Sequence, residues 1–528
     1  MTTTITLILG LLVATVVFAS LATRLRIPYA ILLVFGGALL GFIPGLPRVE
    51  MNPDIVLFLF LPPLVYASAW QTSWRSFRAN LRPILLLAIG LVLVTTVVVA
   101  GTAHLLLGLP WPVAFVLGAV LATTDTVAAN SIAKRMKLPQ RIVAIVEGES
   151  LINDATGLVV YTFAVAAAVT GAFQATTAGW QFIFVSVGGL AIGLLIGWPI
   201  AWLHRHLEDA PIEITMTLLT PFAAYLLAEL AQVSGVLATL AAGLYLSRQS
   251  SRFFSPSTRL AAYAVWDVLV FVLNGLLFLL LGLQLRQILT ITAGHSLATL
   301  AGEALLVSLA VIIIRVVWVF VATYFPRWLA PRLRVRDPYP DWRNVTIVSW
   351  TGMRGGVSLA AALALPLVIA SGQPFPQRDH LIALAFGVIL VTLVGQGLSL
   401  IPLIAWISPK TDDEEERERQ RVRLTAAQAA LKRLQELAEQ GKVPQEMLNN
   451  LHIHYQEQIR HANEHLDGTS PEHTETMAAR QQLRRELIEA ERTAVIGLRD
   501  RGQIDDETLH EIERELDLEE QRIREAAL

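Results

Sequence analysis

The sequence predicts an all-α polytopic membrane protein with about 13 transmembrane helices, inverted repeats and two broken crossing helices, followed by a soluble helical C-terminal tail. Of the 528 residues, 54% are hydrophobic and 16% are charged, and the mean hydropathy is +0.55. Such values are typical of integral membrane proteins. Residues 1–409 hold 23 Lys+Arg against 15 Asp+Glu, whereas residues 410–528 hold 18 against 28. A membrane domain at 1–409 and an acidic tail at 410–528 are therefore expected.

A helix that crosses the bilayer needs about 20 apolar residues. The apolar runs that approach this length are 3–22, 28–43, 54–70, 83–107, 112–133, 142–170, 180–203, 212–230, 233–247, 262–284, 297–325, 344–371 and 379–407. No basic residue precedes the first run, so we expect a retained span rather than a cleaved signal peptide.

Basic residues test this count because they gather in cytoplasmic loops. The odd-numbered loops hold 18 Lys and Arg residues, whereas the even-numbered loops hold Arg48, Arg286 and Arg378. This alternation places the N-terminus outside and the tail in the cytoplasm. His204 and His206 fall in a cytoplasmic loop and are expected to be ordinary exposed histidines.

Spans five and twelve are both predicted to be interrupted. Span five contains the run 122–126, in which Thr and Asp side chains compete for local backbone hydrogen bonds. Span twelve contains three glycines around Arg354, and glycine weakens a helix. The seven-span offset suits an inverted repeat of spans one to six against eight to thirteen. Broken helices at corresponding positions indicate a transporter's binding site.

Span six holds an unusual group of polar residues. Glu147, Ser150 and Asp154 follow an i, i+3, i+7 pattern and share one helix face. Carboxylates are expensive inside a bilayer, so this face is a candidate ion or proton pathway. Its oxygens suit a hard cation, and the carboxylates can alternatively hold protons. Glu147 either lines an access funnel or meets the cytoplasmic interface. Glu149 points away from this face.

These residues occur with other motifs in a specific order. The ordered set resembles bacterial sodium/proton antiporters of the cation:proton antiporter family 1, which includes the eukaryotic sodium/hydrogen exchangers. The matching residues are Leu61-Pro62-Pro63, Thr124-Asp125, the run 149–154, Arg315 and the run 352–356. The family commonly has proline after the span-five aspartate, where this chain has Thr126.

The resemblance implies a role for each site residue. Asp154 would be the main carrier of cation and proton, and Na⁺ would bind at Asp154, Asp125, Ser150 and Thr124. Asn153 would belong to the cation- and proton-binding set, and asparagine rather than a second aspartate at this position resembles the electroneutral members, which exchange one cation for one proton. Glu149 and Arg315 would form a structural ion pair, and Arg354 would compensate the partial charge of the helix ends at the crossing.

The implied function is secondary-active exchange of Na⁺, or of Li⁺ or K⁺, for H⁺ by alternating access. Such a protein is not an enzyme, needs no cofactor, binds no nucleic acid and works as a homodimer in the cell's inner membrane. A carboxylate in low dielectric holds its proton more tightly, which lets protons compete with Na⁺.

Two other functions stay open at this point. A cation channel would use rings of carbonyls or acids along a pore, and the sequence has no repeated filter segment. An intramembrane aspartyl protease would use Asp125 and Asp154 as its pair, but no nucleotide loop, zinc helix or serine–histidine pattern accompanies them. With no cysteine, thiolate catalysis and disulfides are excluded.

The tail is predicted to form two helical hairpins. Glycines at 441 and 502 lie 61 residues apart in similar surroundings, and each follows an expected helix.

Overall fold

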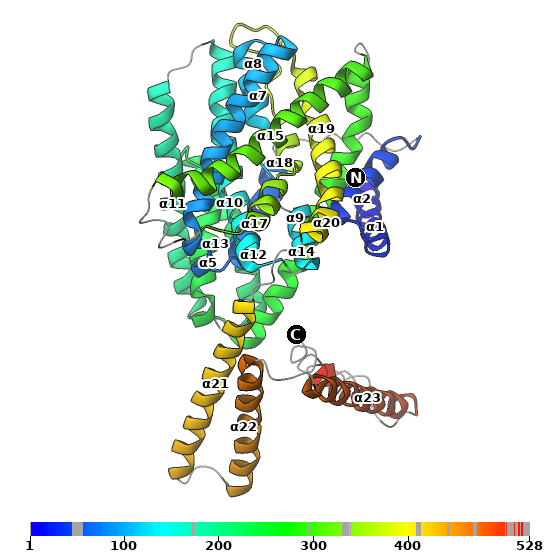
Figure 1. The fold of residues 1–528 in the computed structure, drawn as a ribbon. Coiled ribbons are helices and arrows are strands. Elements are labelled where there is room, and N and C mark those ends of the chain that lie inside the picture. Colours follow the sequence, from blue (N-terminus) through cyan, green and yellow to red (C-terminus); the bar gives the residue numbers. More distant parts are fainter. Residues whose placement is uncertain are drawn as a thin grey trace. The chain divides into compact units, whose positions relative to one another are not determined.

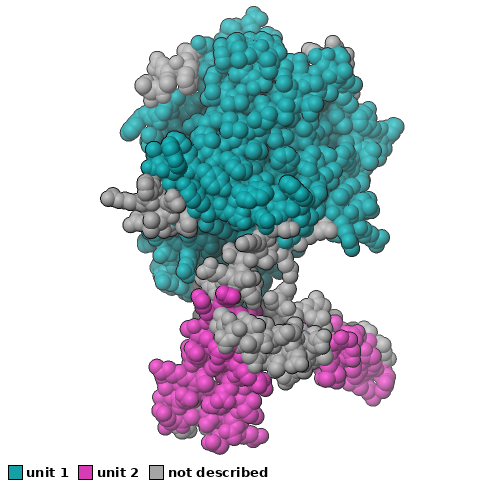
Figure 2. Space-filling model, viewed as in Figure 1, with its two compact units in different colours: residues 1–411 teal, residues 412–528 magenta. Residues whose placement is uncertain are grey.

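The computed structural model describes residues 2–44, 56–125, 127–136, 138–171, 175–207, 209–292, 296–329, 337, 339–407, 413–440, 444–467, 472–501, 503, 512, 516–517 and 519–520. Within these ranges the regular structure is helical throughout, without a β-strand. The chain divides into two compact units, residues 1–411 and 412–528 (Figures 1 and 2). The boundary lies two residues beyond the one expected from charge.

The first unit is a packed set of helices. Its members are α1 (Thr2–Leu25), α2 (Tyr29–Gly41), η1 (Val56–Phe60), α4 (Leu61–Gln71), α5 (Trp74–Ala79), α6 (Leu81–Leu85), η2 (Leu86–Leu91), α7 (Val92–Leu107), α8 (Trp111–Val120), α9 (Val127–Arg135), α10 (Gln140–Thr170), α11 (Ala175–His204), α12 (Ala210–Leu230), α13 (Gly235–Phe253), α14 (Pro256–Ile291), α15 (Leu297–Leu329), α17 (Trp342–Trp350), α18 (Gly356–Leu363), α19 (Arg378–Leu390), η3 (Val391–Gln396) and α20 (Gly397–Ile407).

Eight helical stretches in the described ranges are long and apolar enough to cross a membrane. They are Thr6–Leu25, Leu81–Leu107, Gln140–Thr170, Ala178–His204, Ala210–Leu230, Pro256–Thr290, Leu297–Leu329 and Arg378–Ile407. Shorter apolar helices are Tyr29–Gly41, Leu57–Gln71 and Trp111–Val120. The all-α polytopic fold class is therefore confirmed. The exact number of spans and the inverted repeat stay predictions.

Both predicted interruptions are present. In span five α8 ends at Val120 and α9 begins at Val127, and in span twelve α17 ends at Trp350 and α18 begins at Gly356. The two non-helical segments meet, because the Asp125 N–H donates a hydrogen bond of 2.8 Å to the Met353 carbonyl. Thr126, which replaces the family's usual proline, lies outside the described residues. The crossing thus joins two distant parts of the chain through main-chain atoms.

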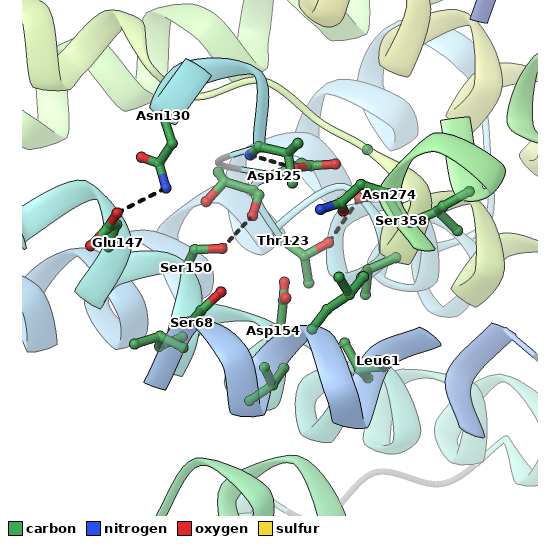
Figure 3. Close-up of a pocket in the computed structure, with 18 of the residues that line it drawn as sticks. Leu61, Ser68, Thr123, Asp125, Asn130, Glu147, Ser150, Asp154, Asn274 and Ser358 are labelled. Atoms are coloured by element: carbon green, nitrogen blue, oxygen red, sulfur yellow. Dashed lines mark hydrogen bonds between the residues drawn. The ribbon is translucent and has the colours of Figure 1, made fainter. Parts of the chain in front are cut away.

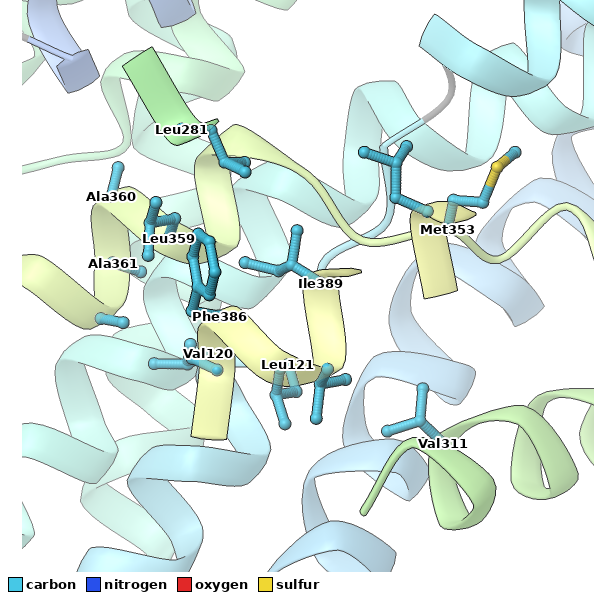
Figure 4. Packing of buried hydrophobic residues seen from close by; sticks show 14 of the residues in the cluster. Val120, Leu121, Leu281, Val311, Met353, Leu359, Ala360, Ala361, Phe386 and Ile389 are labelled. Carbon is cyan, nitrogen blue, oxygen red and sulfur yellow. The ribbon is translucent and has the colours of Figure 1, made fainter. Parts of the chain in front are cut away.

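Apolar side chains pack closely around this crossing (Figure 4). Leu121 follows α8, Leu359 belongs to α18, and Phe386 and Ile389 belong to α19; all four are nearly or completely buried. Lipid is as apolar as these side chains, so what holds the helices together here is close van der Waals packing. This packing supports the unwound backbone at a depth where water cannot supply hydrogen bonds to its N–H and carbonyl groups.

The expectation of exposed histidines is wrong for His204, although His206 is exposed. The His204 imidazole is only 1% exposed and stacks on the Phe253 ring, with 4.7 Å between ring centroids. Its Nδ1 lies 3.6 Å from the buried Glu213 carboxylate. Aromatic side chains at the end of α13 cover the histidine, a contact that its charged sequence neighbours do not indicate.

The second unit contains α21 (Asp413–Glu439), α22 (Gln445–Asp467) and α23 (Glu472–Asp500). α21 and α22 pack against each other, with the expected helix end near residue 441. Near the end of the chain, Ile512 packs against a small cluster of Ile488 and Leu516. Most of the second expected hairpin beyond residue 503 lies outside the described residues.

Candidate functional site

A cavity of about 90 Å³ lies where the span-five break meets α4, α9, α10, α14 and the start of α18. A water molecule needs roughly 10–15 Å³ by the same measure, so the cavity has room for several. Its lining residues are Leu61, Leu64, Val65, Ser68, Thr123, Thr124, Asp125, Val127, Asn130, Glu147, Ser150, Leu151, Asp154, Val270, Asn274, Leu277, Gly355, Val357 and Ser358. The charged groups in this set are three carboxylates.

Asp154 projects from α10 toward the space between Ser150, Thr123 and Asp125 (Figure 3). No hydrogen bond joins its carboxylate to another of the described residues. Both oxygens of Asp154 are therefore available to a ligand. Hydroxyl, carboxylate and amide oxygens around it form the kind of donor set that a hard monovalent cation prefers.

Hydrogen bonds connect α10 to the unwound part of span five. The Ser150 hydroxyl donates to the Thr124 carbonyl at 3.3 Å, and the Asn153 amide donates to the Thr124 hydroxyl at 2.8 Å. Asn153 is buried behind Thr124 and is not among the residues that line the cavity. The structure thus places Asn153 as a support for Thr124 rather than as a cavity ligand.

The Asp125 carboxylate lies beside two helix N-termini. It accepts a hydrogen bond of 2.9 Å from the Val127 N–H at the start of α9. It also lies so close to Gly355, directly before α18, that a Cβ on that glycine would overlap it. Helix N-termini carry partial positive charge, so both helices stabilise a negative charge at Asp125.

Two buried arginines lie beside the opposite helix ends. Arg354 donates hydrogen bonds to the carbonyls of Ala122 and Thr123, at 3.3 and 2.8 Å, directly after α8. Arg315 donates to the Val348 carbonyl at 3.1 Å, in the last turn of α17. Helix C-termini carry partial negative charge, so each arginine stabilises one interrupted helix. The contact of Arg315 with α17 has no signal in the sequence.

Arg315 and Glu149 form a bidentate ion pair. Its hydrogen bonds measure 2.5 and 2.9 Å, and both side chains are 1% exposed. The Thr124 hydroxyl adds a longer contact of 3.4 Å to the same carboxylate. Glu149 lies outside the cavity lining, so the pair fixes α10 to α15 without facing the cavity.

Several polar cavity residues were missed or given little weight by sequence reasoning: Ser68, Thr123, Asn130, Asn274 and Ser358. Ser68 shares an i, i+3, i+4, i+7 face with Leu61, Leu64 and Val65, a pattern that the sequence contains. The sequence does not show that this face points to Asp154. The Ser358 hydroxyl lies 2.8 Å from that of Thr123, which links α18 to the span-five break.

The arrangement of an intramembrane carboxylate between two broken helices can be compared with known proteins. A profile of the family described as "Sodium/hydrogen exchanger, transmembrane" matches residues 10–406. The chain belongs to the sodium/hydrogen exchanger family. It is consequently a multi-pass membrane transporter rather than an enzyme, and family members work without a cofactor because the ions are their substrates.

The sequence similarity to two relatives extends over most of the chain. An uncharacterized Na⁺/H⁺ exchanger of Mycobacterium tuberculosis is 37% identical over 526 residues, covering 98% of this chain and 96% of the relative. A sodium, potassium, lithium and rubidium/H⁺ antiporter of Bacillus pumilus is 35% identical over 391 residues, 72% of this chain and 58% of the relative. The similarity to the mycobacterial protein therefore includes the tail.

The fold also resembles that of a solved structure. The sodium proton antiporter MjNhaP1 from Methanocaldococcus jannaschii superposes with a TM-score of 0.62 and 19% identity, covering 77% of this chain and 99% of that chain. This likeness confirms the antiporter fold that the sequence predicts.

Proposed function

We propose that this chain is a secondary-active antiporter that exchanges a monovalent cation for a proton at Asp154. The observation that carries the proposal is the Asp154 carboxylate, which faces the cavity without a hydrogen bond from any described residue. A cation and a proton would compete for this carboxylate. Asp125, the Ser150 hydroxyl and the Thr124 carbonyl would complete the coordination of Na⁺.

Coupling follows if the unoccupied, charged site cannot cross the barrier between the two sides. Moving a bare carboxylate through low dielectric is unfavourable, whereas a protonated or cation-bound carboxylate is neutral. During alternating access the site would therefore cross the barrier only with a cation or a proton bound. The relative from Bacillus pumilus, named as a sodium, potassium, lithium and rubidium/H⁺ antiporter, supports testing K⁺ and Li⁺ as well as Na⁺.

The test is proton movement in proteoliposomes that contain the purified full-length chain. With an imposed pH gradient, addition of Na⁺, Li⁺ or K⁺ is expected to dissipate the gradient, and Asp154→Asn is expected to abolish this response. Asp267→Asn is the matched control, since Asp267 contacts Gln71 outside the cavity lining. Full activity of Asp154→Asn, or cation flux without proton movement, would contradict the proposal.

We further propose a one-for-one, electroneutral cycle, because Asn153 adds no second titrating charge beside Asp154. The exchange rate is then expected to be the same at clamped membrane potentials of either sign. A rate that follows the potential would overturn this stoichiometry.

The chain is further proposed to be a homodimer in the inner membrane, with the N-terminus outside and the tail in the cytoplasm. The native chain has no cysteine, so any maleimide labelling comes from the single cysteine that is introduced. In intact cells, an impermeant maleimide is expected to label Ser296→Cys but not His206→Cys, both at exposed positions. The opposite labelling would show that the orientation is the reverse of the one proposed.

Measurement of the mass of the purified protein in detergent tests whether it is a dimer.

A further inference from the structure

Glu147 is a third carboxylate on the cavity, beside Asp125 and Asp154. It lies in the third turn of α10, which begins at Gln140. Glu147 precedes Asp154 by seven residues, two helical turns, so the two carboxylates share a face about 10 Å apart along the axis. In Figure 3 Glu147 lies at one side of the site and Asp154 lies near its middle, with Ser150 and Ser68 between them.

Asn130 orients the Glu147 side chain. Its amide nitrogen donates a hydrogen bond of 3.2 Å to Glu147 Oε1, from α9 across to α10. The Asn130 amide oxygen is buried and has no hydrogen-bond partner among the described residues. Because Asn130 lines the same cavity, this oxygen and the neighbouring carboxylate together offer one neutral and one charged ligand.

We propose that Glu147, positioned by Asn130, is the entry site at which a partly hydrated cation binds before it reaches Asp154. A cavity whose charged lining groups are all carboxylates raises the local cation concentration. The Ser150 and Ser68 hydroxyls lie between the two carboxylates and can replace water ligands step by step. This inference rests on the proposed exchange of cation for proton at Asp154.

A purely structural role would be that Glu147 only fastens α10 to α9. Two substitutions separate the roles. Glu147→Gln removes the charge but keeps an oxygen that accepts the Asn130 hydrogen bond. Asn130→Ala removes that bond but keeps the charge. An entry role makes the first substitution the more damaging for cation uptake, and a fastening role makes the second more damaging.

The experiment measures the Na⁺ dependence of exchange in proteoliposomes at low and high ionic strength, set with an impermeant salt. For Glu147→Gln we expect KM for Na⁺ to rise about tenfold at low ionic strength, with a nearly unchanged maximal rate. The rise is expected to shrink at high ionic strength, because salt screens attraction at a water-filled entrance. Glu147→Asp keeps the charge and is expected to stay near the native KM.

An unchanged KM in Glu147→Gln, or a larger rise in Asn130→Ala, would overturn the entry site. If Glu147→Gln cannot be purified folded, Asn130→Ala decides, because it loses the hydrogen bond that orients Glu147. A rise in its KM for Na⁺ with a nearly native maximal rate supports the proposal, and a native KM overturns it. Failure of the exchange proposal is distinct, because it would appear as activity that survives Asp154→Asn at every Na⁺ concentration.

Discussion

At the scale of single residues, Arg315 and Arg354 are both buried, yet different groups balance their charges. Glu149 pairs with Arg315 through two hydrogen bonds, whereas Arg354 donates to main-chain carbonyls at the end of α8. Removing one partner of a buried ion pair leaves an uncompensated charge, which is more destabilising than removing both. The Glu149–Arg315 pair is therefore expected to behave as a unit.

Replacement of Arg315 by methionine tests this coupling. We expect Arg315→Met to lower the free energy of unfolding by about 3–5 kcal/mol, because Glu149 is left buried without its counter-charge. The double variant Arg315→Met with Glu149→Gln is expected to recover a large part of this loss. Thermal unfolding in detergent measures both. A double variant whose loss of stability equals the sum of the losses in Arg315→Met and Glu149→Gln would show that the two residues act independently.

Asn274 offers a second test at this scale. Its side chain is 4% exposed, lines the cavity from α14, and has an amide oxygen without a partner among the described residues. If that oxygen assists cation binding, Asn274→Leu is expected to raise KM for Na⁺ about tenfold, by loss of one polar ligand. Asn274→Ser, which keeps a hydroxyl oxygen, is expected to lose less. Identical KM values in both variants and the native chain would exclude Asn274 from cation binding.

At the scale of the elements, two interrupted helices hold the site by their ends. Asp125 lies at the start of α9 and beside the start of α18, while the arginines lie at the ends of α8 and α17. This arrangement requires very close approach at Gly355, where any side chain would meet the Asp125 carboxylate. The position of Asp125 thus depends on a residue in the other broken span.

Gly355→Ala is expected to displace the Asp125 carboxylate and to lower the exchange rate. A misplacement of about 1 Å in a reacting group can reduce a rate on the order of 100-fold. Gly302→Ala in α15 is the matched control, because open space surrounds that glycine and no change in rate is expected. Transport assays on both variants at matched protein density test the expectation. Native activity in Gly355→Ala would show that the Asp125 position is not critical.

At the scale of the whole molecule, every residue that lines the cavity belongs to the unit of residues 1–411. The second unit supplies none of them. Exchange itself is therefore expected to need only the membrane unit.

A chain that ends at Lys410 tests this division. We expect it to retain cation-driven proton movement and the same sensitivity to Asp154→Asn. Its pH profile, compared with that of the full-length chain, reports whether the tail regulates transport. Loss of exchange in a truncated protein that is still monodisperse and folded would assign the tail a direct part in transport.

The membrane fold was predictable because apolar runs and basic loops leave strong signals along the chain. The interruptions were predictable too, from Thr and Asp in one span and three glycines in the other. The contributions of Ser68, Ser358 and Asn130 to the cavity were not, because no local pattern shows which helix faces converge. The burial of His204 was missed for the same reason: its aromatic cover comes from another helix.

The hydrogen bond between the Asp125 N–H and the Met353 carbonyl has an evolutionary consequence. Every residue has that carbonyl and every residue except proline has that donor, so the tie between the broken spans survives most substitutions at either position. Side chains around the cavity can therefore change by mutation while this main-chain link between the two broken spans is retained. Descendants of such a chain can change their preferred ion in small mutational steps without first losing their fold.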